Sequence, residues 1–118
     1  MKRLARWLAL ALMPVLAAVP ALGHHGWSEY DSTKLLKLPG KIVESGYEHP
    51  HGYIRLETAD KTWLCVLAPP SRMDARGLAR EALKPGVSAT VEGYANRGKP
   101  DEMRAERITV DGKTVELR

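Results

Sequence analysis

The chain has 118 residues, and its 18 Lys and Arg against 14 Asp and Glu give a formal charge of +4. Three of those basic residues, Lys2, Arg3 and Arg6, precede an apolar run near the start, so the rest of the chain is almost neutral. This balance argues against a surface that binds nucleic acid or an anionic membrane, because both need a basic stripe.

Residues 1–23 have the three-part plan of a secretory signal peptide. The basic start is followed by an apolar run from Trp7 to Val19 and then by small residues. As a helix this run reaches only about 20 Å, short of the roughly 30 Å hydrocarbon core of a bilayer. The pattern therefore predicts an exported, periplasmic protein whose mature form has no membrane span.

Two cleavage sites have the required small residues. Cleavage after Gly23, which we favour, makes His24 the first residue, and cleavage after Ala21 makes Leu22 the first. The remaining chain is long enough for one small domain. We expect an N-terminal arm over residues 24–37 and a β domain over residues 38–118. Cys65 is the only cysteine and is expected to be buried.

Turn residues divide the β domain into short segments. The first three predicted strands cover residues 38–47, 53–58 and 62–68, and residues 59–61 form a hairpin turn between the last two. Ile54 and Leu56 alternate toward the core. The third segment is continuously apolar, which predicts a central strand covered on both faces.

A helical stretch is predicted next, over residues 71–83. Ser71 with Asp74 resembles a capping arrangement, and Gly77 is expected to interrupt the helix. Strands are predicted at 87–94, 103–110 and 114–117, and Asp111-Gly112 is a strong two-residue hairpin signal between the last two.

This order predicts an all-β fold with a short helical insertion, a small five- to six-stranded OB-like Greek-key barrel. The alternative is a generic sandwich or open roll built from the same strands. Trp63 lies in the strand taken as central and Trp27 in the arm, so the pattern predicts that Trp63→Ala is far more damaging to stability than Trp27→Ala.

All four histidines occur in two pairs, His24-His25 and His49-Pro50-His51. Imidazole nitrogens suit borderline metal ions such as copper, nickel and zinc. After cleavage at Gly23, the α-amine and imidazole of His24 form a chelating pair for Cu(II). After cleavage at Ala21, histidine stands third from the terminus and offers a square-planar Cu(II) site. The alternatives are a solvated terminus that binds metal adventitiously and a His-Pro-His turn whose side chains bond to backbone or water.

Catalytic motifs are absent from the sequence: it has no nucleophile elbow, phosphate loop or H-E-x-x-H motif. The sequence therefore predicts a protein that is not an enzyme. Its aromatic strand residues are candidates for an OB-type binding face or for ordinary packing, and they are Tyr47, Tyr53, Trp63 and Tyr94.

Several stretches together resemble the exported bacterial family called domain of unknown function 6152. They are HHGWSEYD from His24, Pro50-His51, Pro69 to Met73 and Arg76-Gly77-Leu78. The family usually has asparagine where this chain has His49, so His51 matches better than His49. The resemblance implies a small periplasmic domain with histidines at two fixed places, and it brings no established activity.

Two functions follow from these observations. The first is a copper-binding or copper-handling domain with His24, His25 and His51 as metal ligands and His49 as a fourth candidate. The second is a non-enzymatic envelope module that binds a protein or small ligand on the barrel face or at residues 69–73. The first requires the two histidine pairs to converge, which an arm lying across the turn between the first two strands would achieve.

Overall fold

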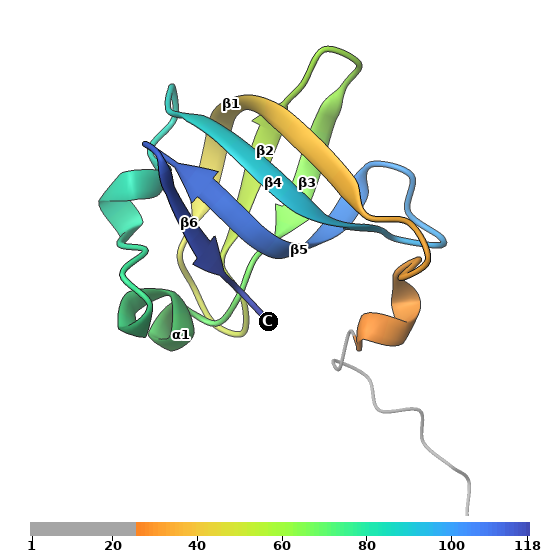
Figure 1. Ribbon diagram of the computed structural model, residues 1–118, viewed down its shortest axis with the longest axis horizontal. Helices are drawn as coiled ribbons and strands as arrows, with labels where there is room; N and C mark the ends of the chain where they lie inside the picture. The colour runs from red at the N-terminus through yellow and green to blue at the C-terminus, as the bar shows by residue number, and fades with distance from the viewer. Residues whose placement is uncertain (1–25) are drawn as a thin grey trace, which may run out of the picture.

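The computed structural model describes residues 26–118, which form one six-stranded sheet closed into a barrel (Figure 1). The predicted signal peptide, His24 and His25 lie outside the described residues. The elements, in chain order, are η1 (Trp27–Glu29), β1 (Leu36–Gly46), β2 (Tyr53–Glu57), β3 (Thr62–Val66), α1 (Pro70–Ala75), η2 (Arg80–Leu83), β4 (Ser88–Ala95), β5 (Glu102–Val110) and β6 (Lys113–Glu116). No helix in this part of the chain is long and apolar enough to cross a membrane.

The strand order is β3-β2-β1-β4-β5-β6, and a parallel pairing of β3 with β5 closes the barrel. This is the predicted OB-like arrangement, with β6 as an additional strand beside β5. Strand β1 is long because it serves two neighbours. Its first half pairs with β4 and its second half with β2, and a bulge between Ile42 and Glu44 bends it soon after the change of partner.

The barrel interior is filled by the inward side chains of every strand. Ile54 and Leu56 are fully buried, as their alternation predicts. Met73 of α1 and Leu83 of η2 close the core from the connection between β3 and β4. Gly77 separates the two helical turns with a φ of 82°, a left-handed conformation that favours glycine, and so confirms the predicted interruption.

Two local predictions were wrong. Strand β3 is not covered on both faces: Thr62 is exposed and Leu64 and Val66 are half-buried, because a barrel strand turns only one face to the core. Ser71 does not cap α1, which begins at Pro70 with no side-chain cap. A proline in the first turn needs no hydrogen-bond partner for its nitrogen, so the helix starts one residue earlier.

The arm packs against the barrel before β1 begins. Tyr30 is only 2% exposed, and its hydroxyl donates to Glu102 Oε2 at 2.9 Å. Its backbone forms an isolated bridge with Asn96, and the neighbouring Asp31 amide donates to the Ala95 carbonyl at 2.9 Å. The arm is therefore held to the end of β4 and the start of β5, and β1 begins at Leu36.

Cys65 is fully buried in β3, and this burial raises the pKa of its thiol to about 12. Because only the thiolate is an effective nucleophile, we expect no reaction with an aromatic disulfide reagent at pH 8 in the folded protein. One thiol per chain should react after unfolding in guanidinium chloride, measured by absorbance of the released product. Rapid labelling without denaturant would contradict the observed packing of β3.

Candidate functional site around His51

His51 lies in the turn between β1 and β2, and backbone hydrogen bonds fix this turn to the residues that follow β3. The Gly52 amide donates to the Ala68 carbonyl and the Leu67 amide donates to the Gly52 carbonyl, each at 2.9 Å. A Cβ added at Gly52 would overlap Met73 Cε, so a larger residue here would force the buried Met73 side chain of α1 to shift. The backbone next to His51 is therefore held by the residues that follow β3, and it packs against α1.

The imidazole of His51 meets a buried guanidinium from β5. Arg104 is 7% exposed, and its Nη2 lies 3.4 Å from His51 Nε2. A guanidinium can only donate, so Nε2 accepts in this contact and Nδ1 carries the imidazole proton. Burial is the main cause that lowers the pKa of Arg104, and the nearby guanidiniums of Arg72 and Arg118 lower it further. Arginine still remains charged in proteins.

Trp27 of the arm covers the same guanidinium. Its ring centroid lies 4.6 Å from Arg104 Cζ and 4.4 Å from Arg118 Cζ, within the range of cation–π contacts. The ring also meets Tyr94 edge-on, with centroids 6.2 Å apart. Trp27 is thus connected to His51 through a single side chain, and the arm lies beside the turn between β1 and β2.

Register explains why these side chains share one outer surface. Tyr94 of β4 pairs with Arg104 of β5, which pairs with Val66 of β3, which in turn pairs with Tyr53 of β2. Paired residues point to the same face of a sheet. Trp27 contacts the first two members of this row and leaves the last two open beside His51.

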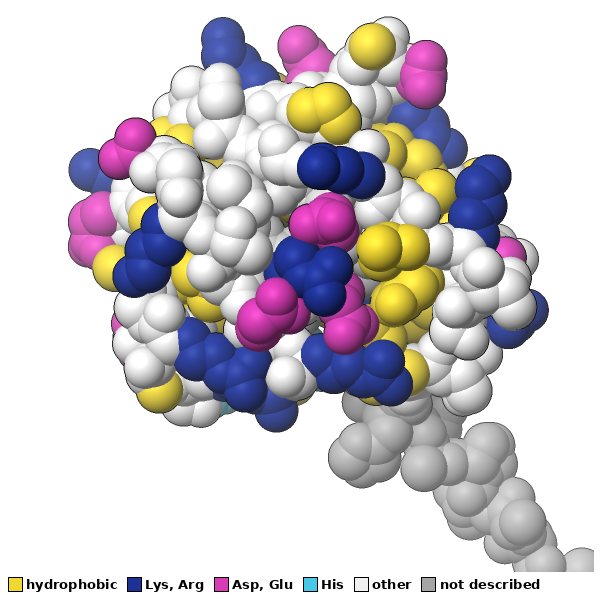
Figure 2. All heavy atoms as spheres, viewed as in Figure 1, with side chains coloured by type: hydrophobic (Ala, Val, Ile, Leu, Met, Phe, Trp, Pro, Cys, Tyr) yellow, Lys and Arg dark blue, Asp and Glu magenta, His cyan; other side chains and the backbone are white. Residues whose placement is uncertain are grey.

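The open part of the row forms a shallow hollow of about 340 Å³. Tyr53 and Arg55 are held on its β2 side by Glu44, which accepts from the Tyr53 hydroxyl at 2.9 Å and pairs with Arg55 Nε at 3.0 Å. The residues that line the hollow are Pro50, His51, Gly52, Tyr53, Arg55, Leu64 and Val66. Elsewhere on the molecule, the face shown in Figure 2 mixes basic and acidic side chains rather than presenting one sign of charge.

The four histidines are placed unequally by the structure. His51 is half-buried at the meeting point of the turn, β5 and the arm, and His49 is exposed on the same turn. Among residues 26–118, no group of three or more His, Cys, Asp or Glu is placed to hold a metal ion. His24 and His25 lie outside the described residues, so their prediction as ligands stays a prediction.

The four aromatic residues do not form one platform. Tyr53 lies on the hollow, and Tyr94 lies against Trp27. Tyr47 turns toward α1, where its hydroxyl lies 2.9 Å from Asp74 Oδ1 and 2.7 Å from the Leu78 carbonyl. Trp63 packs against the core under the Lys61 ammonium, 4.2 Å from its ring centroid.

Sequence reasoning missed Arg104 and the role of Trp27. Arg104 lies in an alternating strand where an arginine is ordinarily exposed, and nothing near it in the sequence indicates the tryptophan that covers it. The outward-facing Leu64 and Val66 were also missed, since a continuous apolar run looks the same whether its second face is buried or lines a hollow.

Comparisons with known proteins support the fold. The model of the family of unknown function DUF6152 matches residues 13–104. A crystal structure of TiaS in complex with a tRNA and ATP is similar with a TM-score of 0.52 and 21% identity over 75% of this chain and 19% of that one. The ZRD-deleted mutant of TiaS with agmatine has a TM-score of 0.51 and 21% identity, over 75% and 25%. This chain therefore spans a quarter or less of those proteins, and the likeness shows the barrel fold alone. No curated protein matches the sequence.

Proposed function

The chain belongs to the family of unknown function DUF6152, and we propose that it is a periplasmic, non-enzymatic Cu(II)-binding protein whose arm brings His24 and His25 to His51. The observation that carries this proposal is the contact series from Trp27 through Arg104 to His51. It puts the arm beside the turn between β1 and β2, which is the condition that convergence of the histidine pairs requires.

Chain connectivity limits how far the first pair can be from the second. His25 precedes Trp27 by two residues, and consecutive Cα atoms are about 3.8 Å apart. The ring centroid of Trp27 lies 4.6 Å from Arg104 Cζ, and Arg104 Nη2 lies 3.4 Å from His51 Nε2. These separations are short enough for imidazoles from both pairs to reach one ion.

The donor set suits copper better than the harder metal ions. Imidazole nitrogens favour Cu(II), and cleavage after Gly23 would add the α-amine of His24. Arg104 Nη2 lies 3.4 Å from Nε2 of His51. Copper bound at Nε2 would have to displace that guanidinium, so metal binding would exchange one partner of His51 for another.

Calorimetric titration of the mature protein with Cu(II) tests this proposal. We expect about one equivalent to bind, and binding to be lost as the pH falls through about 6, because coordinating imidazoles must be unprotonated. His51→Ala and a His24→Ala/His25→Ala double variant should each weaken binding by at least about tenfold. Asp60→Asn, an exposed change in the turn between β2 and β3 that removes no candidate ligand, is the control and should have little effect.

Trp27→Ala distinguishes a metal site that depends on the packing of the arm from one formed by the terminus alone, because the change removes no candidate metal ligand. If the arm positions the first histidine pair, this variant should also bind Cu(II) more weakly. Unchanged affinity in both Trp27→Ala and His51→Ala would show that the terminus acts alone and would overturn the proposal.

The second candidate is a binding module for a protein or small ligand. The half-buried Leu64 and Val66, side by side with Tyr53 in the hollow, favour it. In that case the histidines have a structural role and bind no metal. Cu(II) affinity no better than that of a free histidine-containing peptide would favour this second function over the first.

A further inference from the structure

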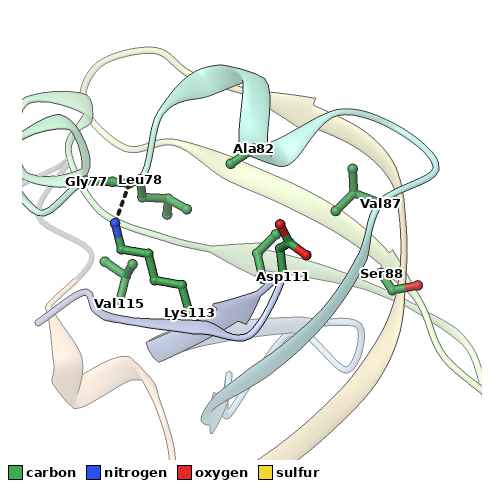
Figure 3. Close-up of a pocket in the computed structure, with 9 residues that line it drawn as sticks. Gly77, Leu78, Ala82, Val87, Ser88, Asp111, Lys113 and Val115 are labelled. Atoms are coloured by element: carbon green, nitrogen blue, oxygen red, sulfur yellow. Dashed lines mark hydrogen bonds between the residues drawn. The ribbon is translucent and has the colours of Figure 1, made fainter.

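A larger cavity opens on another part of the barrel, between η2 and the hairpin of β5 and β6 (Figure 3). Its volume is about 660 Å³, within the range of small-molecule sites. Its lining shares no residue with the hollow beside His51. The lining residues are Gly77, Leu78, Ala82, Val87, Ser88, Val110, Asp111, Lys113 and Val115.

The walls of this cavity are apolar and belong to the barrel core. Leu78, Val110 and Val115 are all buried members of the core cluster, and Ala82 and Val87 pack partly buried against it. A ligand here would therefore exchange water for contact with aliphatic side chains, a favourable transfer of apolar surface. The cavity is built for a ligand with an apolar body.

Two opposite charges stand at the same opening. Lys113 Nζ donates to the Gly77 carbonyl at 3.2 Å, which uses one of its three donors. The Asp111 carboxylate rises from the hairpin into the cavity, while the Lys113 ammonium lies at the Gly77 end (Figure 3). No ion pair joins Asp111 to Lys113 among the interactions of residues 26–118.

The hairpin itself places these two charges. Asp111 and Gly112 have φ values of 51° and 74°, so the two-residue turn is the left-handed kind that matches strand twist. Gly77 also matters, because a Cβ there would lie 2.5 Å from Lys113 Nζ. Glycine at this position leaves room for the ammonium to reach the carbonyl.

We propose that this cavity binds a short apolar peptide with free ends, of about two residues. Its ammonium group would lie at Asp111, its carboxylate at Lys113, and its side chains against Leu78, Ala82 and Val87. The Asp111 carboxylate would repel a purely anionic amphiphile, and the Lys113 ammonium would repel a purely cationic one. A zwitterion satisfies both groups, so charge complementarity selects this occupant.

Titration of the ¹⁵N-labelled protein with leucyl-leucine tests the proposal, with amide shifts of Leu78, Ala82 and Val87 as the signal. N-acetyl-leucyl-leucine lacks the ammonium and leucyl-leucine amide lacks the carboxylate. We expect each of these analogues to bind about tenfold more weakly, because each loses one charge-assisted contact. The analogues test the wild-type protein and need no variant to fold.

Two variants assign the charges. Asp111→Asn keeps the turn, since asparagine tolerates positive φ. It should weaken the binding of leucyl-leucine but not that of the acetylated analogue, which has no ammonium and is no longer repelled by a carboxylate. Lys113→Gln should weaken the binding of leucyl-leucine but not that of the amide analogue, which has no carboxylate and is no longer repelled by an ammonium. Asp60→Asn, in the exposed turn between β2 and β3, is the control and should change nothing.

Equal affinity for leucyl-leucine and both analogues would overturn the proposal, because the charges would then select nothing. Absence of shifts at these three amides with millimolar dipeptide would overturn it as well. Neither result depends on copper, so the outcome is independent of the proposed function at His51.

Discussion

Replacing Gly93 by alanine is expected to destabilise the barrel by about 3 kcal/mol, a large part of the stability of a domain this small. A Cβ at Gly93 would lie 2.0 Å from the Arg104 carbonyl oxygen and 2.8 Å from Ala105 Cα. These atoms belong to the backbone of β5 and cannot turn away as a flexible side chain can. Strand β4 would have to separate from β5 at the bulge between Glu92 and Gly93.

Urea unfolding followed by circular dichroism measures this loss. Gly98→Ala is the matched control, because the nearest atom to an added Cβ there is Asn96 Oδ1 at 3.8 Å and the loop is exposed. It should shift the midpoint very little. Equal midpoints for the two variants would mean that β4 and β5 are not packed as closely as described.

Trp27→Ala and Trp63→Ala are expected to lower stability by similar amounts, about 2 kcal/mol each. This differs from the sequence expectation that Trp63 matters far more. Both tryptophans are half-buried. Trp63 packs against the core, and Trp27 packs on Arg104, Arg118 and Tyr94. Thermal unfolding of the two variants provides the comparison.

Leu35→Ala serves as the control for those two changes, because Leu35 immediately precedes β1 and is 48% exposed. It should change the melting temperature little. A Trp27→Ala variant that melts like the wild type would show that the arm contributes nothing to barrel stability, and it would remove the structural support for a docked copper site.

The order of the barrel strands was predictable because each strand ends at a strong local signal. Asp111-Gly112 adopts the two-residue turn that its residue types favour, and Gly77 has the positive φ that ends α1. The exposure of the second face of β3 was not predictable from the sequence. Whether Leu64 and Val66 are covered depends on the curvature of the closed sheet, which no local pattern encodes.

The candidate site was predicted only in part. His51 was chosen from its pairing with His49, and the structure separates the two by burial. The neighbour of His51 was missed, since Arg104 is 53 positions away in the chain and Trp27 approaches from another segment. Contacts between side chains so distant in sequence follow from strand register, and register becomes known only with the fold.

The parallel pairing of β3 with β5 has a consequence for how the protein folds. Leu64 pairs with Glu102, so this closure joins two segments that α1, η2 and β4 separate in the chain. Strands β1 to β3 and β4 to β6 can each form from neighbouring hairpins, whereas joining the two halves carries the entropy cost of long loops. The pairing of β3 with β5 also covers backbone groups on both strands that would otherwise be open to edge-to-edge association with another chain.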